Sequence, residues 1–269
     1  MTRIWRYASP SMFHRLAGRL WAPFALSAAV FALAGLGIAF FAAPTDAQQG
    51  EVYRIMFLHV PAAWMSMLIY FVMAAYAGLG FIFRTRLSHL MARALAPTGL
   101  LYGVIALISG SVWGKPTWGT WWVWDARLTS QVVLLCLYLG FMALHNAFEE
   151  RERAERTSAL FAIVGLVNLP VIYFSVVWWN TLHQGASLSA SGVRMAPIML
   201  AGLVTMTLAC WCHAIAVSLV RARTLIVEME ADRSWLHRQG ARYIAKPVLR
   251  SVGHNGTWDT NAQQRDGSS

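Results

Sequence analysis

The chain has 269 residues, of which 57% are hydrophobic and only 13% are charged, and its formal net charge is +10. Soluble globular domains carry about 25% charged residues, so this composition excludes an ordinary soluble globular domain. The cations cluster in short connections between apolar runs, which makes membrane topology a better explanation of the basic charge than nucleic-acid binding.

Six long apolar runs predict an all-α, polytopic membrane protein with six transmembrane helices. At about 1.5 Å per residue, each run is long enough to cross a hydrocarbon core about 30 Å thick. The first run follows a basic N-terminus, as in a signal peptide, but it is too long for a typical signal sequence and is interpreted as a retained span. The expected helices cover residues 20–43, 57–83, 94–113, 128–147, 159–179 and 197–220.

Prolines are expected to mark several helix starts. A proline in the first turn costs no hydrogen bond, because its N–H would be unpaired there in any case. Pro170 instead lies in the middle of the fifth run, where it is expected to kink the helix. The prolines expected in first turns are Pro23, Pro61, Pro97 and Pro197.

The distribution of cations predicts the orientation of the chain. All but four of the 22 Lys and Arg residues lie in the N-terminal segment, in the second and fourth connections, or after residue 220. Because cytoplasmic segments carry the excess of cations, both termini are expected in the cytoplasm. The four cations expected on the outer side are Arg54, Lys115, Arg127 and Arg194.

This orientation divides the chain into three segments. They are a cytoplasmic N-terminal segment (1–19), a six-helix transmembrane domain (20–220) and a cytoplasmic tail (221–269). In the domain, the charge run 149–156 is interpreted as a solvated helical extension with i,i+4 pairs, with partner docking as the alternative. The start of the tail is expected to form a helix on the inner membrane surface, followed by a disordered end. The apolar residues of that helix are Leu225, Ile226, Met229 and Leu236.

A tryptophan-rich loop is expected at residues 114–127, on the outer side, which in a Gram-negative bacterium is the periplasmic side of the inner membrane. Aromatic belts anchor ordinary membrane proteins, but so many indoles in one short loop exceed what anchoring needs. The loop is therefore interpreted as a shelf for something flat and apolar. Its tryptophans, with the one just before it, are Trp113, Trp118, Trp121, Trp122 and Trp124. Belt residues or secondary parts of the site are Trp64, Trp178 and Trp179.

Of the eight histidines, only His59 and His183 are expected on the outer side. His59 begins the second helix and His183 follows the fifth, so a compact bundle can bring both to the loop. Two neutral imidazoles on opposite faces can bind haem iron axially. Taken alone, either histidine is better explained as a satisfied polar residue at the interface. The pair and the tryptophans together favour the ligand interpretation.

Charged residues near the loop are candidate partners for the two haem propionates. Arg127 is nearest to the loop, and its guanidinium matches carboxylate geometry; Arg54 and Arg194 are weaker candidates. Arg127 has an alternative role as the partner of Asp125 or as the start of the fourth helix. Asp125 has an alternative role as the N-cap of that helix.

Other patterns exclude competing chemistries. The chain has neither a Cys-x-x-Cys-His motif for covalent haem attachment nor a P-loop for ATP hydrolysis. Cys136, Cys210 and Cys212 all lie in expected spans, so no disulfide is expected. Cys210, Cys212 and His213 are interpreted as packing residues and not as a metal cluster.

The segment from Trp118 to Arg127, which continues Leu-Thr-Ser, resembles the tryptophan-rich WWD signature of the haem-handling protein superfamily. Within it, His59-Val-Pro-Ala-Ala-Trp64 and Leu182-His-Gln-Gly185 resemble the two flanking histidine motifs of the haem exporter protein C family. Six spans and two outer histidines match this family better than the larger haem lyase subunit or the system II synthase. The resemblance covers residues 20–220.

The resemblance implies a non-enzymatic protein of system I cytochrome c maturation. Such proteins hold haem b non-covalently, as a bis-histidine complex, at the periplasmic face of the inner membrane. They present it to a membrane-tethered haem chaperone, protein E of the pathway. They associate with an ABC transporter, proteins A and B, and with a small single-span protein D. Carried over to this sequence, His59 and His183 are the axial ligands. The shelf and chaperone platform are Trp113, Trp118, Trp121, Trp122, Trp124 and Asp125.

Two other functions are consistent with a six-helix membrane protein. An electron-transfer cytochrome b subunit needs histidine pairs on facing helices, and the helix-interior candidates, His145 and His213, are both expected near the inner ends. A secondary transporter or haem channel needs ionisable residues in mid-membrane, of which the expected spans contain almost none.

Overall fold

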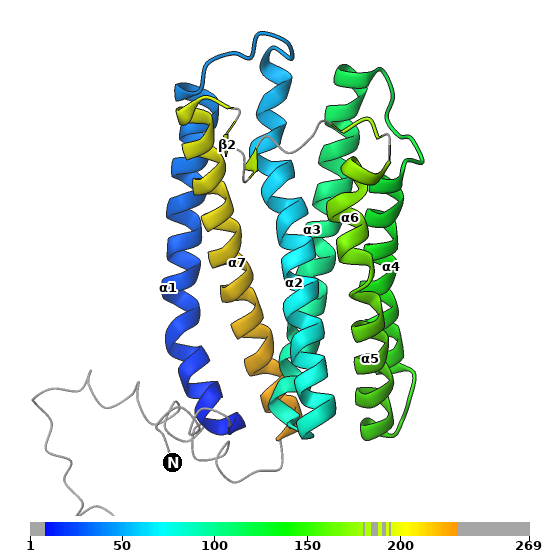
Figure 1. Cartoon of the computed structure of the whole chain (residues 1–269). Coiled ribbons are helices and arrows are strands. Elements are labelled where there is room, and N and C mark those ends of the chain that lie inside the picture. The colour runs from blue at the N-terminus through cyan, green and yellow to red at the C-terminus, as the bar shows by residue number, and fades with distance from the viewer. Residues whose placement is uncertain (1–8, 180, 184–187, 190–191, 194, 231–269) are drawn as a thin grey trace, which may run out of the picture. The chain divides into compact units, whose positions relative to one another are not determined.

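The computed structural model describes residues 9–179, 181–183, 188–189, 192–193 and 195–230. Within these residues, six helical stretches are long and apolar enough to cross a membrane, which confirms the predicted all-α fold with six spans. All six belong to one structural unit, Met1–Glu228. The stretches alternate in direction and pack side by side as a bundle, with α1 next to α7 (Figure 1).

Seven α-helices make up the six spans. The first span joins α1 to a π-helix, the second joins a 3-10 helix to α2, and the fifth joins α5 to α6. A two-residue antiparallel strand pair, β1 and β2, precedes α7. In chain order the elements are α1 (Pro10–Gly37), η2 (Ile38–Ala42), η3 (Glu51–Ile55), α2 (Met56–Phe83), α3 (Arg86–Trp118), α4 (Ala126–Asn146), α5 (Arg151–Gly165), α6 (Asn168–Trp178), β1 (Leu188–Ser189), β2 (Gly192–Val193) and α7 (Pro197–Met229).

Several helices extend beyond the apolar runs that predicted them. α1 begins at Pro10, α3 begins at Arg86 and α7 ends at Met229. Arginine has good helix propensity, and its long side chain can reach water from the end of a span, so a charge does not end a helix. Only Pro197 therefore holds the predicted first-turn position. The first-turn prediction is wrong for Pro23, Pro61 and Pro97, which lie inside helices.

The extension of α7 includes the first part of the helix that was expected on the membrane surface. Ile226 is completely buried, so this end of α7 packs against the other helices of the bundle and does not lie on the membrane surface as a separate helix. Leu236 and the rest of the tail lie outside the described residues, as do residues 1–8 of the N-terminal segment.

Pro170 interrupts the fifth span, in agreement with the predicted kink. α5 ends at Gly165 and α6 begins at Asn168. Between them, the Leu166 N–H donates at 3.1 Å to the carbonyl of Ile163, which is three residues earlier and not four as in an α-helix. Pro170 cannot donate to the Leu166 carbonyl, and its ring crowds that oxygen. The break therefore falls one turn before the proline.

The charged start of α5 is a helical extension with i,i+4 ion pairs, as predicted. Arg151 lies 2.7 Å from Glu155, and Arg156 lies 3.2 Å from Glu152. Glu155 also lies 4.0 Å from His89, which connects this end of α5 to α3. The Arg156–Glu152 pair is exposed on both sides and contributes little to stability, because water screens its charges.

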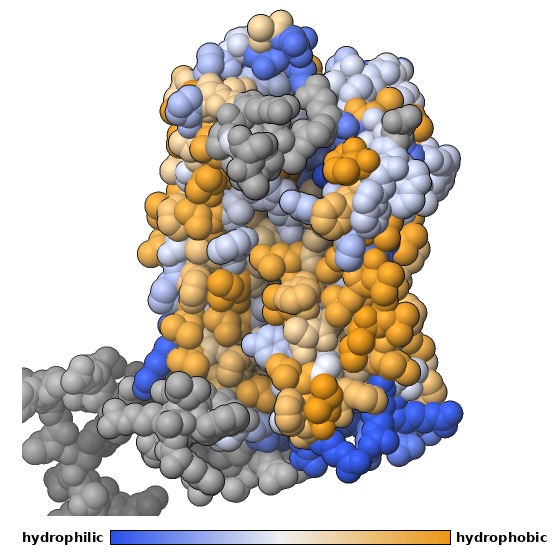
Figure 2. All heavy atoms as spheres, in the orientation of Figure 1, coloured by the Kyte–Doolittle hydropathy of each residue, from blue (hydrophilic) through white to orange (hydrophobic). Residues whose placement is uncertain are grey.

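The ends of the bundle differ in chemistry. Apolar side chains cover its middle, and hydrophilic side chains gather at the two ends (Figure 2). We call the end with the α2–α3 and α4–α5 connections the arginine-rich end, and the end with the α3–α4 connection the tryptophan end. The arginine-rich end carries Arg84, Arg86, Arg151 and Arg153.

Buried hydroxyl groups join the helices at the centre of the bundle. Tyr70 and Tyr138 are completely buried, and their rings meet edge to face with centroids 5.1 Å apart. Tyr138 Oη donates to the Ser66 carbonyl at 2.7 Å, and Tyr70 Oη donates to the Ala162 carbonyl at 3.2 Å. Gln131 Nε2 donates to Ser66 Oγ at 3.0 Å. Because lipid offers no alternative partners, these bonds fix how α2, α4 and α5 pack.

The close approach of α3 to α4 predicts the effect of Gly99→Ala. A Cβ at Gly99 would overlap Tyr138 Oη, so the substitution should destabilise the fold by about 1–3 kcal/mol. Thermal unfolding in detergent, followed by circular dichroism, measures the change. The control is Gly37→Ala, because a Cβ at Gly37 meets nothing within 4 Å. Equal melting temperatures for the two variants would contradict the packing described.

Candidate functional site

The tryptophan-rich segment is partly helical. α3 continues through Trp118 and ends at Gly119, whose φ of +79° lies in the left-handed region that favours glycine. The irregular loop is therefore residues 119–125, which is shorter than the predicted 114–127. Asp125 is the N-cap of α4, since its Oδ1 accepts a hydrogen bond from the backbone N–H three residues later at 2.8 Å.

His59 projects from the first turn of α2 toward α3. Its Nδ1 lies 3.0 Å from the Ala106 carbonyl oxygen and 3.2 Å from Ser109 Oγ. A carbonyl can only accept, so the geometry assigns the proton to Nδ1 and leaves the Nε2 lone pair available to a metal. The ring also meets Trp113 edge-on, with centroids 5.6 Å apart. Gly110 permits this approach, because a Cβ there would lie 2.8 Å from the His59 ring.

His183 lies in the segment after α6, against the loop. Its ring centroid is 5.1 Å from that of Trp118, and its Nδ1 is 3.8 Å from Asp125 Oδ2. The same carboxylate oxygen accepts a hydrogen bond from the Leu182 N–H at 3.3 Å. Burial, and then the positive charge of Arg127, lowers the pKa of His183 to about 4, while the Asp125 carboxylate acts in the opposite direction. The imidazole is therefore neutral at pH 7, the form that binds metals.

The fold brings His59 and His183 into one cluster at the tryptophan end. Both His183 and Arg127 are near enough to act electrostatically on His59. Arg127 and Asp125 act in turn on His183. The four side chains come from α2, the start of α4, the loop and the segment after α6, so only the folded bundle assembles them. The cluster offers two neutral nitrogen donors beside one carboxylate and one guanidinium.

The indoles of the loop form a surface with a small hollow beside it. Trp121 and Trp124 are 57% and 72% exposed, and Trp122 packs edge-on against Trp124 with centroids 5.2 Å apart. The hollow, between the end of α3, the loop and His183, has a volume of about 10 Å³. That is room for a single water, so a flat ligand of porphyrin size must lie across the exposed indoles and not inside.

Unsatisfied polar atoms concentrate at this site. Of the six buried side-chain polar atoms that lack a hydrogen-bond partner among the described residues, three lie here. They are Trp122 Nε1, Thr181 Oγ1 and His183 Nδ1. Buried polar groups are normally paired, so these atoms are available to a water or a ligand.

The other predicted tryptophans are spread around the tryptophan end. The Trp113 indole N–H donates to Gln49 Oε1 at 2.8 Å, which connects α3 to the loop before η3. Trp64 is half-buried and packs against the small cluster around Phe57. Trp178 and Trp179 are exposed and meet edge to face, with centroids 5.7 Å apart.

The arginines predicted as propionate partners lie in different parts of the structure. Arg54 bonds to Glu51 and to the carbonyl oxygens of Ala39 and Ala43, so its guanidinium caps the first span. Arg127 lies half-buried at the start of α4, within electrostatic range of Asp125. Arg194 lies outside the described residues.

The sequence did not reveal the groups that hold His59. Ala106, Ser109 and Gly110 lie on α3, about 50 residues away along the chain, and only tertiary packing connects them to His59. The spacing of Gly110 and Trp113 on one helix face was the available signal.

The helix-interior histidines have other partners. His213 lies near the middle of α7, farther from the inner end than predicted because α7 is longer, and its Nδ1 is 2.9 Å from Tyr102 Oη. His145 Nδ1 is 3.5 Å from Ser158 Oγ. Among the described residues, the contacts of His213 include no other histidine, whereas His145 lies within electrostatic range of His89 at the arginine-rich end.

Comparison with known proteins accounts for almost the whole chain. The family model described as "Heme exporter protein C" matches residues 3–237, which include all six spans and the cluster above. The chain belongs to the heme exporter protein C family. It is 43% identical over 229 residues to "Heme exporter protein C" of Escherichia coli strain K12, a match that covers 85% of this chain and 93% of the relative. The protein of that name in Haemophilus influenzae is 41% identical over 238 residues, covering 86% and 94%. That in Bradyrhizobium diazoefficiens is 47% identical over 189 residues, covering 69% and 70%.

The charges around His183 predict how its titration changes in variants. Arg127→Gln should raise the pKa of His183 above about 4, because a repelling charge is lost, and Asp125→Asn should lower it, because an attracting charge is lost. Nuclear magnetic resonance of histidine-labelled protein in micelles, with His183→Gln to assign the signal, measures both. A His183 signal that titrates near 6.5 in the unmodified chain would contradict the burial described.

Proposed function

We propose that this chain binds haem b non-covalently at the periplasmic face of the inner membrane and delivers it during cytochrome c maturation. The axial ligands are His59 and His183, and the loop indoles support the porphyrin. The observation that carries the proposal is that both imidazoles pack against tryptophans at the same end of α3, His59 against Trp113 and His183 against Trp118. The chain acts by holding and passing on its cargo and not as an enzyme, and both of its termini lie in the cytoplasm.

The state of the two imidazoles supports axial ligation. His59 donates from Nδ1 to the Ala106 carbonyl, so Nε2 keeps its lone pair. His183 is neutral at pH 7, and its Nδ1 lies 3.8 Å from Asp125 Oδ2; a proton on Nδ1 would face that carboxylate and leave the Nε2 lone pair available. A carboxylate behind a ligating histidine fixes its orientation and raises its basicity. Neither ligand must lose a proton before iron binds.

The loop supports recognition of the porphyrin edge and its propionates. Trp121 and Trp124 offer exposed apolar area on which a flat ring can lie. The Trp122 N–H is a buried donor with no partner among the described residues, and Arg127 supplies a guanidinium close by. Both suit a propionate, whereas an entirely hydrocarbon ligand would leave them unsatisfied.

The exposure of the site supports transfer in preference to storage. Because the hollow is too small for a porphyrin, the ring must stay on the surface with one edge open. A partner with its own histidine can then approach the haem directly. We propose that this partner is the periplasmic haem chaperone, protein E, and that the chain works in a complex with the ABC transporter proteins A and B and the single-span protein D.

Removal of either histidine should abolish bis-histidine haem. His59→Ala and His183→Ala proteins, purified from haem-replete cells, should each lose most of the Soret absorbance, because five-coordinate haem on an open surface dissociates readily. His213→Ala is the matched control and should keep its haem, since His213 pairs with Tyr102 away from the loop. Wild-type haem content in both outer variants would remove the ligand assignment.

Gly110→Ala should weaken haem binding without touching a ligand. The new methyl group displaces the His59 ring, and second-shell changes of this kind cost about 10–100-fold in affinity. Haem titration followed by absorbance measures the loss. Gly78→Ala is the control, because its Cβ would make only ordinary contact, 3.7 Å from Ile163. Equal affinities in the two variants would show that the His59 position does not matter.

A further inference from the structure

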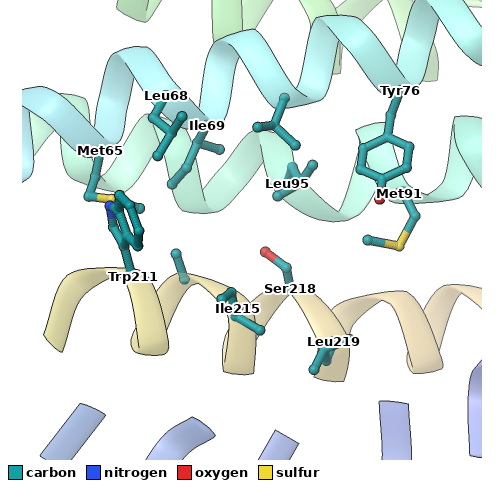
Figure 3. Close-up of a pocket in the computed structure, with 12 residues that line it drawn as sticks. Met65, Leu68, Ile69, Tyr76, Met91, Leu95, Trp211, Ile215, Ser218 and Leu219 are labelled. Atoms are coloured by element: carbon teal, nitrogen blue, oxygen red, sulfur yellow. The ribbon is translucent and has the colours of Figure 1, made fainter. Parts of the chain in front are cut away.

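A cavity separate from the haem site lies between α2, α3 and α7 (Figure 3). Its volume is about 300 Å³. An apolar cavity of about 150 Å³ stays dry and binds benzene, so this one has room for a substantial apolar ligand. The side chains that line it include Met65, Ile69, Tyr76, Leu95, Trp211 and Leu219.

The cavity opens sideways, toward lipid. Its rim includes Leu68, Trp211 and Ile215, which are 40%, 46% and 40% exposed. All three lie within membrane-length helices, so the opening faces the hydrocarbon region and not water. An occupant can therefore enter from the bilayer without crossing a polar surface.

Two polar side chains, Tyr76 and Ser218, line this otherwise apolar space. Ser218 is buried, and its hydroxyl has no hydrogen-bond partner among the described residues. The other hydroxyl residues of α7 bond to the carbonyl four residues earlier, as Thr207 does at 2.8 Å, and Thr205 and Thr224 do likewise. Ser218 instead points from α7 toward α2 and α3 (Figure 3). Its hydroxyl is thus free to bond to an occupant.

The dimensions and polarity of the cavity match one kind of occupant. From Trp211 to Leu219 it follows α7 for about 12 Å, parallel to the spans. Ser218 and Tyr76 lie toward the arginine-rich end, and Arg221 is exposed less than one turn beyond Ser218. The other end of the cavity, at Met65 and Trp211, reaches the middle of α7. The polar end therefore lies near the membrane surface and the apolar end near its centre.

We propose that the cavity binds one acyl chain of a glycerophospholipid from the leaflet at the arginine-rich end. The Ser218 hydroxyl donates to an ester carbonyl of the lipid, and Arg221 lies at the level of its phosphate. A partner helix, about 10 Å wide, is too large for this space. A porphyrin does not match it either, because the lining residues include no histidine and no cation.

Native mass spectrometry of the full-length protein, purified in mild detergent, tests the proposal. We expect one co-purifying phospholipid. Ser218→Ala should lower its occupancy several-fold, and Ala214→Phe, which fills the cavity, should abolish it. The matched controls are Thr224→Ala, which removes a hydroxyl that bonds within α7, and Val220→Phe, which places the same aromatic side chain at an exposed position. Both controls should retain the lipid, and melting curves confirm that every variant is folded.

A second measurement locates the bound acyl chain within the protein. Phosphatidylethanolamine with a diazirine in one acyl chain is added to delipidated protein and photolysed. Adducts on Met65, Ile69 and Trp211 support the proposal. Adducts confined to the outward face of α1, equal lipid retention in all four variants, or retention of a tetrapyrrole in the cavity would overturn it. None of these outcomes depends on His59 or His183, so the lipid site and the haem function can fail separately.

Discussion

The hydrocarbon core of the bilayer offers no hydrogen-bond partner, so the polar groups at that depth depend on partners that the protein supplies. The bundle meets this constraint mainly with backbone carbonyls. Tyr138 donates to the Ser66 carbonyl, and Arg54 caps carbonyls where the π-turn ends the first span. These bonds leave little freedom in how the helices pack. The positions of the loop and of the segment after α6 follow from that packing.

Acceptors supplied by the protein also orient the two histidines, in different ways. His59 donates to a neutral carbonyl within the helical packing, which holds one tautomer and one ring orientation. His183 faces a carboxylate that also caps α4 and accepts the Leu182 N–H. Asp125 therefore couples the start of a helix to the position of a histidine far along the chain. For the haem transfer proposed above, a site with one rigid and one more loosely held nitrogen would suit a cargo that is both held and released.

Hydropathy predicted the number of spans because burial of long apolar runs in lipid leaves no alternative fold. It placed several helix ends wrongly, since arginines at a span end, as at Arg86, continue the helix. Sidedness selected His59 and His183 from eight histidines, because charge asymmetry is readable along the chain. The partners of His59, including Ala106 and Gly110, were not predictable, because a carbonyl or a missing Cβ carries no signal before the tertiary contact exists.

The bonds that each cation near the loop already makes indicate which of them could bind a haem propionate. Arg54 already satisfies a carboxylate and two carbonyls, and Lys115 donates to the Gly119 carbonyl at 3.1 Å. Using either for a propionate would leave those acceptors unpaired, which costs about 1–3 kcal/mol for each buried one. Among the residues that the structure describes, the Arg127 guanidinium makes no such bond and is attracted to Asp125. A propionate at Arg127 would compete with Asp125 for the guanidinium, while Asp125 keeps its N-cap bond, so the charge can be shared without unfolding the start of α4.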